Sequence, residues 1–203
     1  MSDKKITPVG AKKMGAKSWL IENALVVVIF LMVIFTSFSA DNFLNFGNLK
    51  NILTNVSVRF VIALGVSGCL ITRGTDLSAG RIVGLTAVLS ACLLQRPEAP
   101  GVLYENLAGT AIPIALIAAV LIGMFFGLIN GLVVAFLNVP PFIATLGTQI
   151  AIYGLNMMLS MNKPIGSLNQ AYTAFGVQGV KLGSLVIPYL FFAALLVGVL
   201  MYI

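Results

Sequence analysis

The 203-residue sequence contains no histidine, only six acidic residues and only two cysteines. With so few imidazole and carboxylate groups, general acid–base catalysis and zinc coordination have almost no side chains to use. The two cysteines, Cys69 and Cys92, lie inside apolar stretches and form no CxxC pair, so they indicate neither a disulfide framework nor a metal site. We therefore predict no enzymatic activity, no metal and no cofactor.

Charge of either sign is also scarce. Charged residues make up 9% of the chain, apolar residues make up 59%, and the mean hydropathy is +1.04. Soluble domains are about 25% charged and about 45–50% apolar. This composition excludes an ordinary soluble domain and predicts an all-α polytopic membrane helix bundle with about six transmembrane helices, in contact with the lipid bilayer.

Positive charge gathers at the start of the chain. Residues 1–18 hold five lysines and a single acid, Asp3. By the positive-inside rule we predict that residues 1–18 form a cytoplasmic basic tail and that residues 19–203 form the membrane domain. A lipid-headgroup patch is the less favoured interpretation. Nucleic-acid binding is not predicted, because no aromatic residues alternate with the lysines.

Apolar stretches and turn residues together predict the order of the spans. No charged residue occurs from Asn106 to Asn162, and one helix of that length would be about 85 Å long, against a hydrocarbon core of about 30 Å. Pro140 and Pro141 are where this stretch must break. The first three predicted spans cover about 23–40, 52–72 and 81–96. The fourth ends near Leu137, the fifth begins at about Pro141, and the sixth covers 182–203. The predicted loops cover 41–50, 97–107 and 163–181. Because the last span reaches Ile203 still within an apolar run, we expect the chain to be the N-terminal part of a longer protein.

The polar segment RGTDLSAGR, residues 73–81, separates two apolar stretches. Glycine disfavours a continuous helix here, and Ser and Asp favour helix N-termini. We predict a hinge formed by Arg73, Asp76, Ser78 and Arg81. Either Asp76 or Ser78 caps the helix that follows, and we expect Asp76 to pair with one of the two arginines.

Two further patterns lie between Asn106 and Asn162. Gly123, Gly127 and Gly131 form a GxxxGxxxG ridge, which favours close helix packing. On the next span, Thr145, Gln149 and Asn156 fall within about 40° of one another at 100° per residue. Either they hydrogen-bond to a neighbouring helix, or they line an uncharged polar path for a hydroxyl-rich solute. Asn130, beside the ridge, is placed in the same candidate path.

The runs ALGVSGCLITRGTDLSAGRIVGLTA (63–87) and GLINGLVVAFLNVPPFIATLGT (127–148) resemble the permease subunits of bacterial ABC sugar importers. The resemblance is to the ribose, xylose and galactose branch of the family that also includes branched-chain amino acid permeases. Within that branch, the residues of these runs most resemble permeases for galactose and methyl galactoside.

The resemblance implies a multi-pass inner-membrane subunit that carries a monosaccharide. Its implied partners are a second permease subunit, ATP-binding cassette ATPase subunits and a periplasmic sugar-binding protein. No GxxxxGK[ST] phosphate-binding loop occurs in the sequence, so ATP is expected to bind to the partner subunits. Two alternatives stay open, a permease for another solute such as branched-chain amino acids, and a truncated membrane fragment without transport activity.

Overall fold

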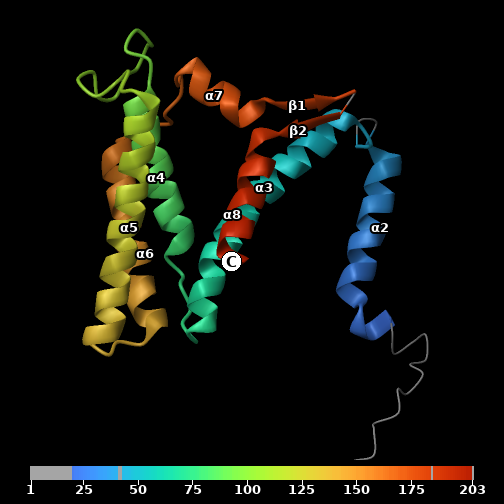
Figure 1. Cartoon of the computed structure of the whole chain (residues 1–203), viewed down its shortest axis with the longest axis horizontal. Helices are drawn as coiled ribbons and strands as arrows, with labels where there is room; N and C mark the ends of the chain where they lie inside the picture. The colour runs from blue at the N-terminus through green and yellow to red at the C-terminus, as the bar shows by residue number, and fades with distance from the viewer. Residues whose placement is uncertain (1–19, 41–42, 184, 203) are drawn as a thin grey trace, which may run out of the picture. The chain divides into compact units, whose positions relative to one another are not determined.

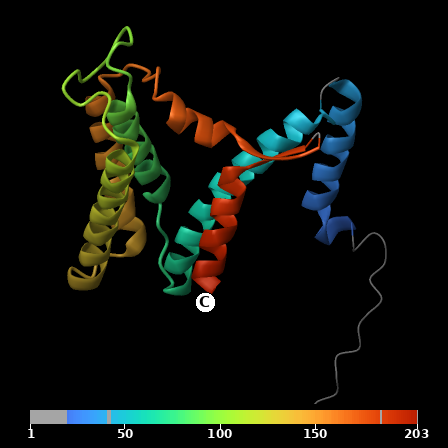
Figure 2. The same ribbon diagram turned by 45° about the horizontal axis from the view of Figure 1, so that its top comes forward.

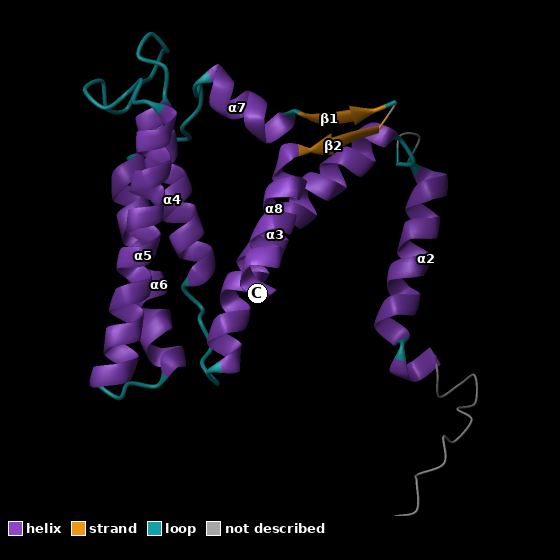
Figure 3. Cartoon of the chain, viewed as in Figure 1, coloured by secondary structure: helices purple, strands orange, loops and turns teal. Residues whose placement is uncertain are grey.

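The computed structural model describes residues 20–40, 43–183 and 185–202, and within them helices predominate, with one short β-hairpin (Figure 3). The basic tail predicted for residues 1–18 lies outside the described residues. In chain order the elements are α2 (Ala24–Ser39), α3 (Phe46–Ile71), α4 (Ala79–Leu94), α5 (Ile112–Phe136), α6 (Pro141–Ser160), α7 (Gln170–Val177), β1 (Gly179–Leu182), β2 (Leu185–Pro188) and α8 (Tyr189–Tyr202).

The chain divides into two compact units, and the first ends at Asn48. Its helix α2 has no buried residue, and large apolar side chains such as Phe30 and Phe35 are exposed on it. A helix that is apolar on all sides is typical of a lipid environment. The sequence prediction of a first span at 23–40 is confirmed as a helix of nearly the same extent.

The predicted loop at 41–50 is wrong in its second half, because α3 already begins at Phe46. The side chain of Asn45 accepts a hydrogen bond from the backbone N–H of Gly47 at 3.1 Å. The Asn48 side chain in turn donates to the carbonyl of Phe43 at 2.9 Å. These local bonds stabilise the first turn of the helix, as asparagine does at helix N-termini.

In the second unit, α4, α5 and α6 lie side by side in both views (Figures 1 and 2). Their shared interior is small and holds Leu85 and Leu94 of α4, Ala115 of α5 and Ile152 of α6, each at most 2% exposed. Most other large apolar side chains of these helices are exposed. This distribution suits a bundle whose outer surface contacts lipid rather than water.

The connections alternate between the two ends of this bundle. At one end, the backbone N–H of Leu77, before α4, donates to Thr145 near the start of α6. At the other end, residues after α4 and after α6 meet, where Asn169 N–H donates to the Leu94 carbonyl at 2.8 Å and Gln95 pairs with Leu168. Consecutive membrane spans require this alternation. The predicted break is confirmed, because α5 ends at Phe136 and α6 begins at Pro141.

Within the described residues, three helices are long and apolar enough to cross a membrane, namely α3, α5 and α6. The apolar helices α2, α4 and α8 have 16, 16 and 14 residues, or about 21–24 Å at 1.5 Å per residue. The structure therefore bears out a helical membrane bundle. Helix α4 is shorter than a full membrane span because the residues that precede it are not helical.

The final apolar stretch differs from its prediction as one span from 182 to 203. Leu185–Pro188 instead pair with Gly179–Leu182 as an antiparallel hairpin, with Lys181 opposite Val186. Pro188 disfavours a helix interior, so α8 begins after it. Gly179 lies against the Ile187 backbone, where a Cβ has no room.

The predicted loop at 163–181 was also too simple. It contains α7, which the Asn169 side chain caps by accepting from Ala171 N–H at 2.9 Å. The same stretch contains β1. Helix α8 itself packs along α3, with Gly198 facing the ring of Phe60 (Figure 1).

Candidate functional site

The candidate site is built around a non-helical hinge between α3 and α4, residues 72–78. Arg73 has a left-handed backbone with φ of 58°, and the N–H of Gly74 donates to the Cys69 carbonyl at 2.9 Å. A Cβ at Gly74 would lie 3.6 Å from Pro141 of α6. The hinge therefore lies in ordinary van der Waals contact with the first turn of α6.

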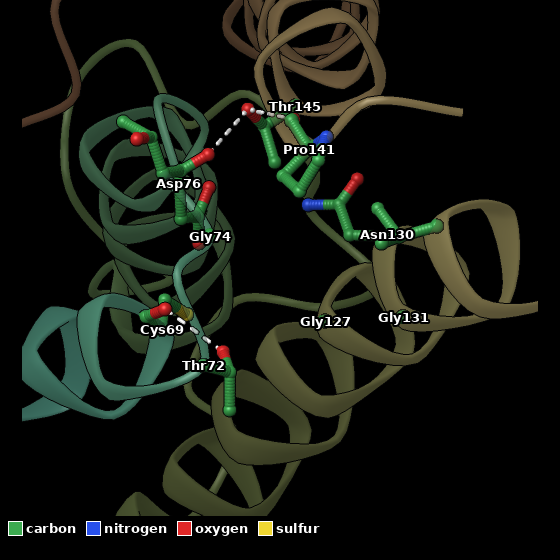
Figure 4. Close-up of a pocket in the computed structure, with 11 residues that line it drawn as sticks. Cys69, Thr72, Gly74, Asp76, Gly127, Asn130, Gly131, Pro141 and Thr145 are labelled. Atoms are coloured by element: carbon green, nitrogen blue, oxygen red, sulfur yellow. Dashed lines mark hydrogen bonds between the residues drawn. The ribbon is translucent and has the colours of Figure 1, made fainter. Parts of the chain in front are cut away.

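Thr145 of α6 holds the backbone of this hinge. Its hydroxyl oxygen accepts from the N–H of Leu77 at 3.2 Å. Its single proton has three carbonyl oxygens within reach, at 2.8 Å on Pro141, 3.2 Å on Thr75 and 3.4 Å on Phe142 (Figure 4). Thr145 is only 4% exposed. At membrane depth, irregular backbone needs such partners, because lipid supplies none.

A directional chain of side-chain hydrogen bonds fixes the end of the hinge to α5 and α6. The Thr148 hydroxyl donates to Asn130 Oδ1 at 2.6 Å, and Asn130 Nδ2 donates to Ser78 Oγ at 2.8 Å. The Ser78 hydroxyl then donates to Asp76 Oδ1 at 2.7 Å. Asn130 and Ser78 are buried away from water, so these bonds supply the partners that their polar atoms need. We call these four residues the hinge network.

A cavity of about 330 Å³ opens beside the hinge, between α5 and α6 (Figure 4). Its volume falls within the range typical of small-molecule sites. Apart from the Asp76 carboxylate, its polar side chains are uncharged. The residues lining it are Cys69, Thr72, Gly74, Thr75, Asp76, Gly127, Asn130, Gly131, Val134, Pro141 and Thr145.

The hinge residues take partly different roles from those predicted. Asp76 forms a turn just before the helix and does not cap it, because its Oδ1 accepts the N–H and the hydroxyl of Ser78, each at 2.7 Å, and no N–H of α4. Ser78 occupies the N-cap position, but its side chain makes no capping bond. Among the described residues no ion pair joins Asp76 to Arg73 or Arg81. Instead the Arg81 guanidinium lies 4.8 Å from the ring centroid of Tyr153.

The predicted polar stripe on α6 divides into two parts. Thr145 is buried and lines the cavity, whereas Gln149 and Asn156 are half-buried and lie outside its lining. Asn156 faces α4, since a Cβ at Gly84 would lie 3.5 Å from its Nδ2. Its Oδ1 is buried without a hydrogen-bond partner among the described residues.

The glycine ridge likewise divides. Gly123 approaches α4, where a Cβ would lie 3.9 Å from Ile82. Gly127 and Gly131 line the cavity, and a Cβ at either position would meet no atom within 4 Å. In this chain the two glycines leave space open beside Asn130.

Sequence reasoning missed Thr148 and Thr75. Thr148 lies one helical turn after Thr145, on a neighbouring part of the same face of α6, so its spacing could have included it. Thr75 contributes its backbone carbonyl, which no side-chain pattern reveals. The described residues contain no group of three or more His, Cys, Asp or Glu side chains that could hold a metal ion.

The fold and the cavity define a class of protein, a polytopic helical membrane protein with a cavity of small-molecule size between its helices. The family described as the permease component of branched-chain amino acid transport systems matches residues 48–203. The chain belongs to this permease family, which confirms the resemblance found in its sequence motifs.

Several curated relatives are similar over most of this chain. It is 41% identical over 182 residues to the galactose/methyl galactoside import permease protein MglC of Salmonella typhimurium (strain LT2), an alignment covering 88% of this chain and 54% of the relative. Identity to the ribose import permease protein RbsC of Escherichia coli (strain K12) is 29%, covering 78% of this chain and 46% of the relative.

The autoinducer 2 import system permease protein LsrC of Escherichia coli (strain SMS-3-5) is 31% identical, with 71% of this chain and 39% of the relative covered. The chain thus spans about half the length, or less, of these relatives. No solved structure matches the chain significantly.

Proposed function

We propose that this chain forms the membrane-embedded part of an ABC importer permease that carries a monosaccharide of the galactose or methyl-galactoside kind. The observation that carries the proposal is the 41% identity to a galactose/methyl galactoside permease, which extends over 88% of this chain. The ribose permease is similar over a shorter part of the chain and at lower identity.

The chemistry of the cavity supports a neutral polyol as solute. Threonine hydroxyls, an asparagine amide and one carboxylate line it, and these groups exchange hydrogen bonds with sugar hydroxyls. Because Asn130 is bonded within the hinge network and Thr145 is bonded to the hinge backbone, few groups remain to hold the solute tightly. Weak holding suits a subunit that passes solute onward.

The assembly we propose contains a second permease subunit, two ATPase subunits and a periplasmic sugar-binding protein, in the bacterial inner membrane. The import permeases to which the chain is similar support this arrangement. In it, the chain's own residues supply the path, and ATP hydrolysis takes place on the partners.

A chimera tests the proposal. Residues 20–203 replace the aligned segment of the Salmonella permease in a strain that lacks its own galactose permease, and uptake of labelled methyl galactoside is measured. We expect restored uptake of methyl galactoside in preference to ribose. Membrane abundance, measured by immunoblot, controls for insertion.

Three outcomes would count against the proposal. Uptake of labelled leucine instead of sugar would favour the branched-chain amino acid alternative. Preferential uptake of ribose would contradict the galactose assignment. A chimera that is abundant in the membrane but transports none of these solutes would favour a fragment without transport activity.

A further inference from the structure

A second polar feature lies on the α4–α6 face, apart from the hinge network. The Arg81 guanidinium of α4 sits over the ring of Tyr153 of α6, 4.8 Å from its centroid. Both side chains are exposed, and Tyr153 has an exposed fraction of 47%. A cation–π contact of this kind leaves the five N–H donors of the guanidinium free to bond elsewhere.

The pair lies deep within the span. Helix α6 has 20 residues, which is about 30 Å and matches the hydrocarbon core. Tyr153 follows Pro141 by about 18 Å and precedes Ser160 by about 10 Å along the axis. Helix α4 begins only at Ala79, after the hinge, so its first turn already lies at this depth.

Arg81 has no acidic partner there. Among the described residues, no ion pair involves it. One turn after Tyr153, the Oδ1 of Asn156 is a buried acceptor without a partner. An ionised side chain at this depth almost always faces a bundle interior or a water-filled space. Two neighbouring helices thus offer unmatched polar groups, cationic donors on one and an amide oxygen on the other.

We propose that the α4–α6 face lines an aqueous solute path, in which Arg81 and Tyr153 contact the sugar directly. The guanidinium donates hydrogen bonds to sugar hydroxyl oxygens, and the Tyr153 ring packs against the apolar C–H face of the pyranose. That this face lines an aqueous path is argued from the position of the Arg81 charge. That the solute is a sugar rests on the proposed function. Thr145 is hydrogen-bonded to the hinge backbone. The solute contact that we propose therefore lies further along α6, at Tyr153.

Single-tryptophan fluorescence of the whole 203-residue chain in lipid nanodiscs tests both portions. Trp19 is the chain's one tryptophan, so Trp19→Phe with Tyr153→Trp places one reporter at the proposed contact. The matched control is Phe125→Trp in the same background, because Phe125 is near the middle of α5 and 57% exposed. We expect acrylamide to quench the reporter at 153, and brominated lipid to quench the one at 125.

Sugar binding is then measured with the same reporter. We expect millimolar methyl galactoside to shift the emission at position 153 and to protect it from acrylamide. Sorbitol at equal osmolality controls for solvent effects. Adding Arg81→Gln should remove the sugar response. Adding Arg96→Gln should keep it, because Arg96 is an exposed arginine beyond the other end of α4.

An uptake assay in the chimera adds a second readout. Arg81→Gln should lower the maximal rate about tenfold at unchanged membrane abundance, the effect of one lost charged hydrogen bond. Arg96→Gln should leave the rate unchanged.

The proposal is overturned if brominated lipid, and not acrylamide, quenches the reporter at 153. It is also overturned if sugar leaves that reporter unchanged while the chimera transports methyl galactoside. A leucine response in place of a sugar response would uphold the aqueous path and remove the sugar contact together with the proposed function.

Discussion

The hinge network and the α4–α6 face are neighbouring regions that share only helix α6, and they differ in how their polar groups are satisfied. In the hinge network each side chain has a partner within the chain, from Thr148 to Asp76. On the α4–α6 face, Arg81 has an aromatic neighbour but no acidic partner in the described part of the chain, where Asn156 Oδ1 also has no hydrogen-bond partner. The difference separates groups that maintain the fold from groups that remain available to a solute.

The largest effect is expected from breaking the hinge network at its centre. Asn130→Leu removes the amide that bonds to both Ser78 and Thr148 and places an apolar side chain among buried polar groups, and each lost hydrogen bond alone costs about 0.5–1.5 kcal/mol. We expect little folded protein in the membrane, measured by immunoblot and by fluorescence-detected gel filtration. Asn106→Ala, in an exposed loop, is the control. Normal abundance of Asn130→Leu would show that the network is dispensable.

Asp76→Ala should have the next largest effect. It removes the acceptor for both the N–H and the hydroxyl of Ser78, and each such hydrogen bond contributes about 0.5–1.5 kcal/mol to stability. We expect lower abundance of folded protein and an unchanged sugar preference in the uptake assay. Asp76→Asn keeps an acceptor oxygen and should retain more folded protein. Altered preference at full abundance would instead identify Asp76 as a solute contact.

Thr145→Val should cost less, because it preserves shape and removes one hydroxyl. The Leu77 N–H loses its acceptor, and hydrogen bonds between membrane helices contribute about 0.6 kcal/mol on average. A small decrease in the melting temperature of detergent-purified protein is expected. Thr110→Val offers a comparison, since that hydroxyl bonds only to the nearby Leu107 carbonyl. Equal decreases in melting temperature for both variants would show that the Thr145 hydroxyl contributes no more to stability than the Thr110 hydroxyl.

Gln149→Leu should have the smallest effect on stability, because Gln149 is half-buried and its side chain forms no hydrogen bond with any described residue. Because its spacing places Gln149 on the candidate solute path, we expect Gln149→Leu to slow uptake at normal membrane abundance. The measurement is the initial rate of methyl galactoside uptake by the chimera, with Ile150→Leu, on the exposed side of α6, as the control. An unchanged rate would remove Gln149 from the path.

Sequence patterns predicted the elements that depend on local chemistry. The apolar run before Asp41, the break at Pro140-Pro141 and the non-helical hinge around Asp76 all appear where composition placed them. Each is a local consequence of apolar length or of proline and glycine geometry. The hairpin at 179–188 was missed because the three apolar residues before Pro188 fit a strand and a helix equally well.

The candidate site was only partly predictable. Composition and spacing drew attention to Asp76, Asn130 and Thr145, which the structure brings together around one cavity. They could not show that Ser78 bonds to Asn130, because the two residues are far apart in sequence and meet only when α4 packs on α5. The expected pairing of Asp76 with Arg81 failed for the same reason, since Tyr153 of another helix holds the guanidinium.

The late start of α4 also has an electrostatic consequence. A helix N-terminus carries the equivalent of about half a positive charge, and here that end lies beside the cavity, where Asp76 accepts the hydrogen bonds of Ser78. The carboxylate offsets this macrodipole, and Arg81 adds a full positive charge one turn later. The two ends of the polar region therefore carry charges of opposite sign, and in the solute path proposed above this separation would favour a dipolar neutral solute over a small ion.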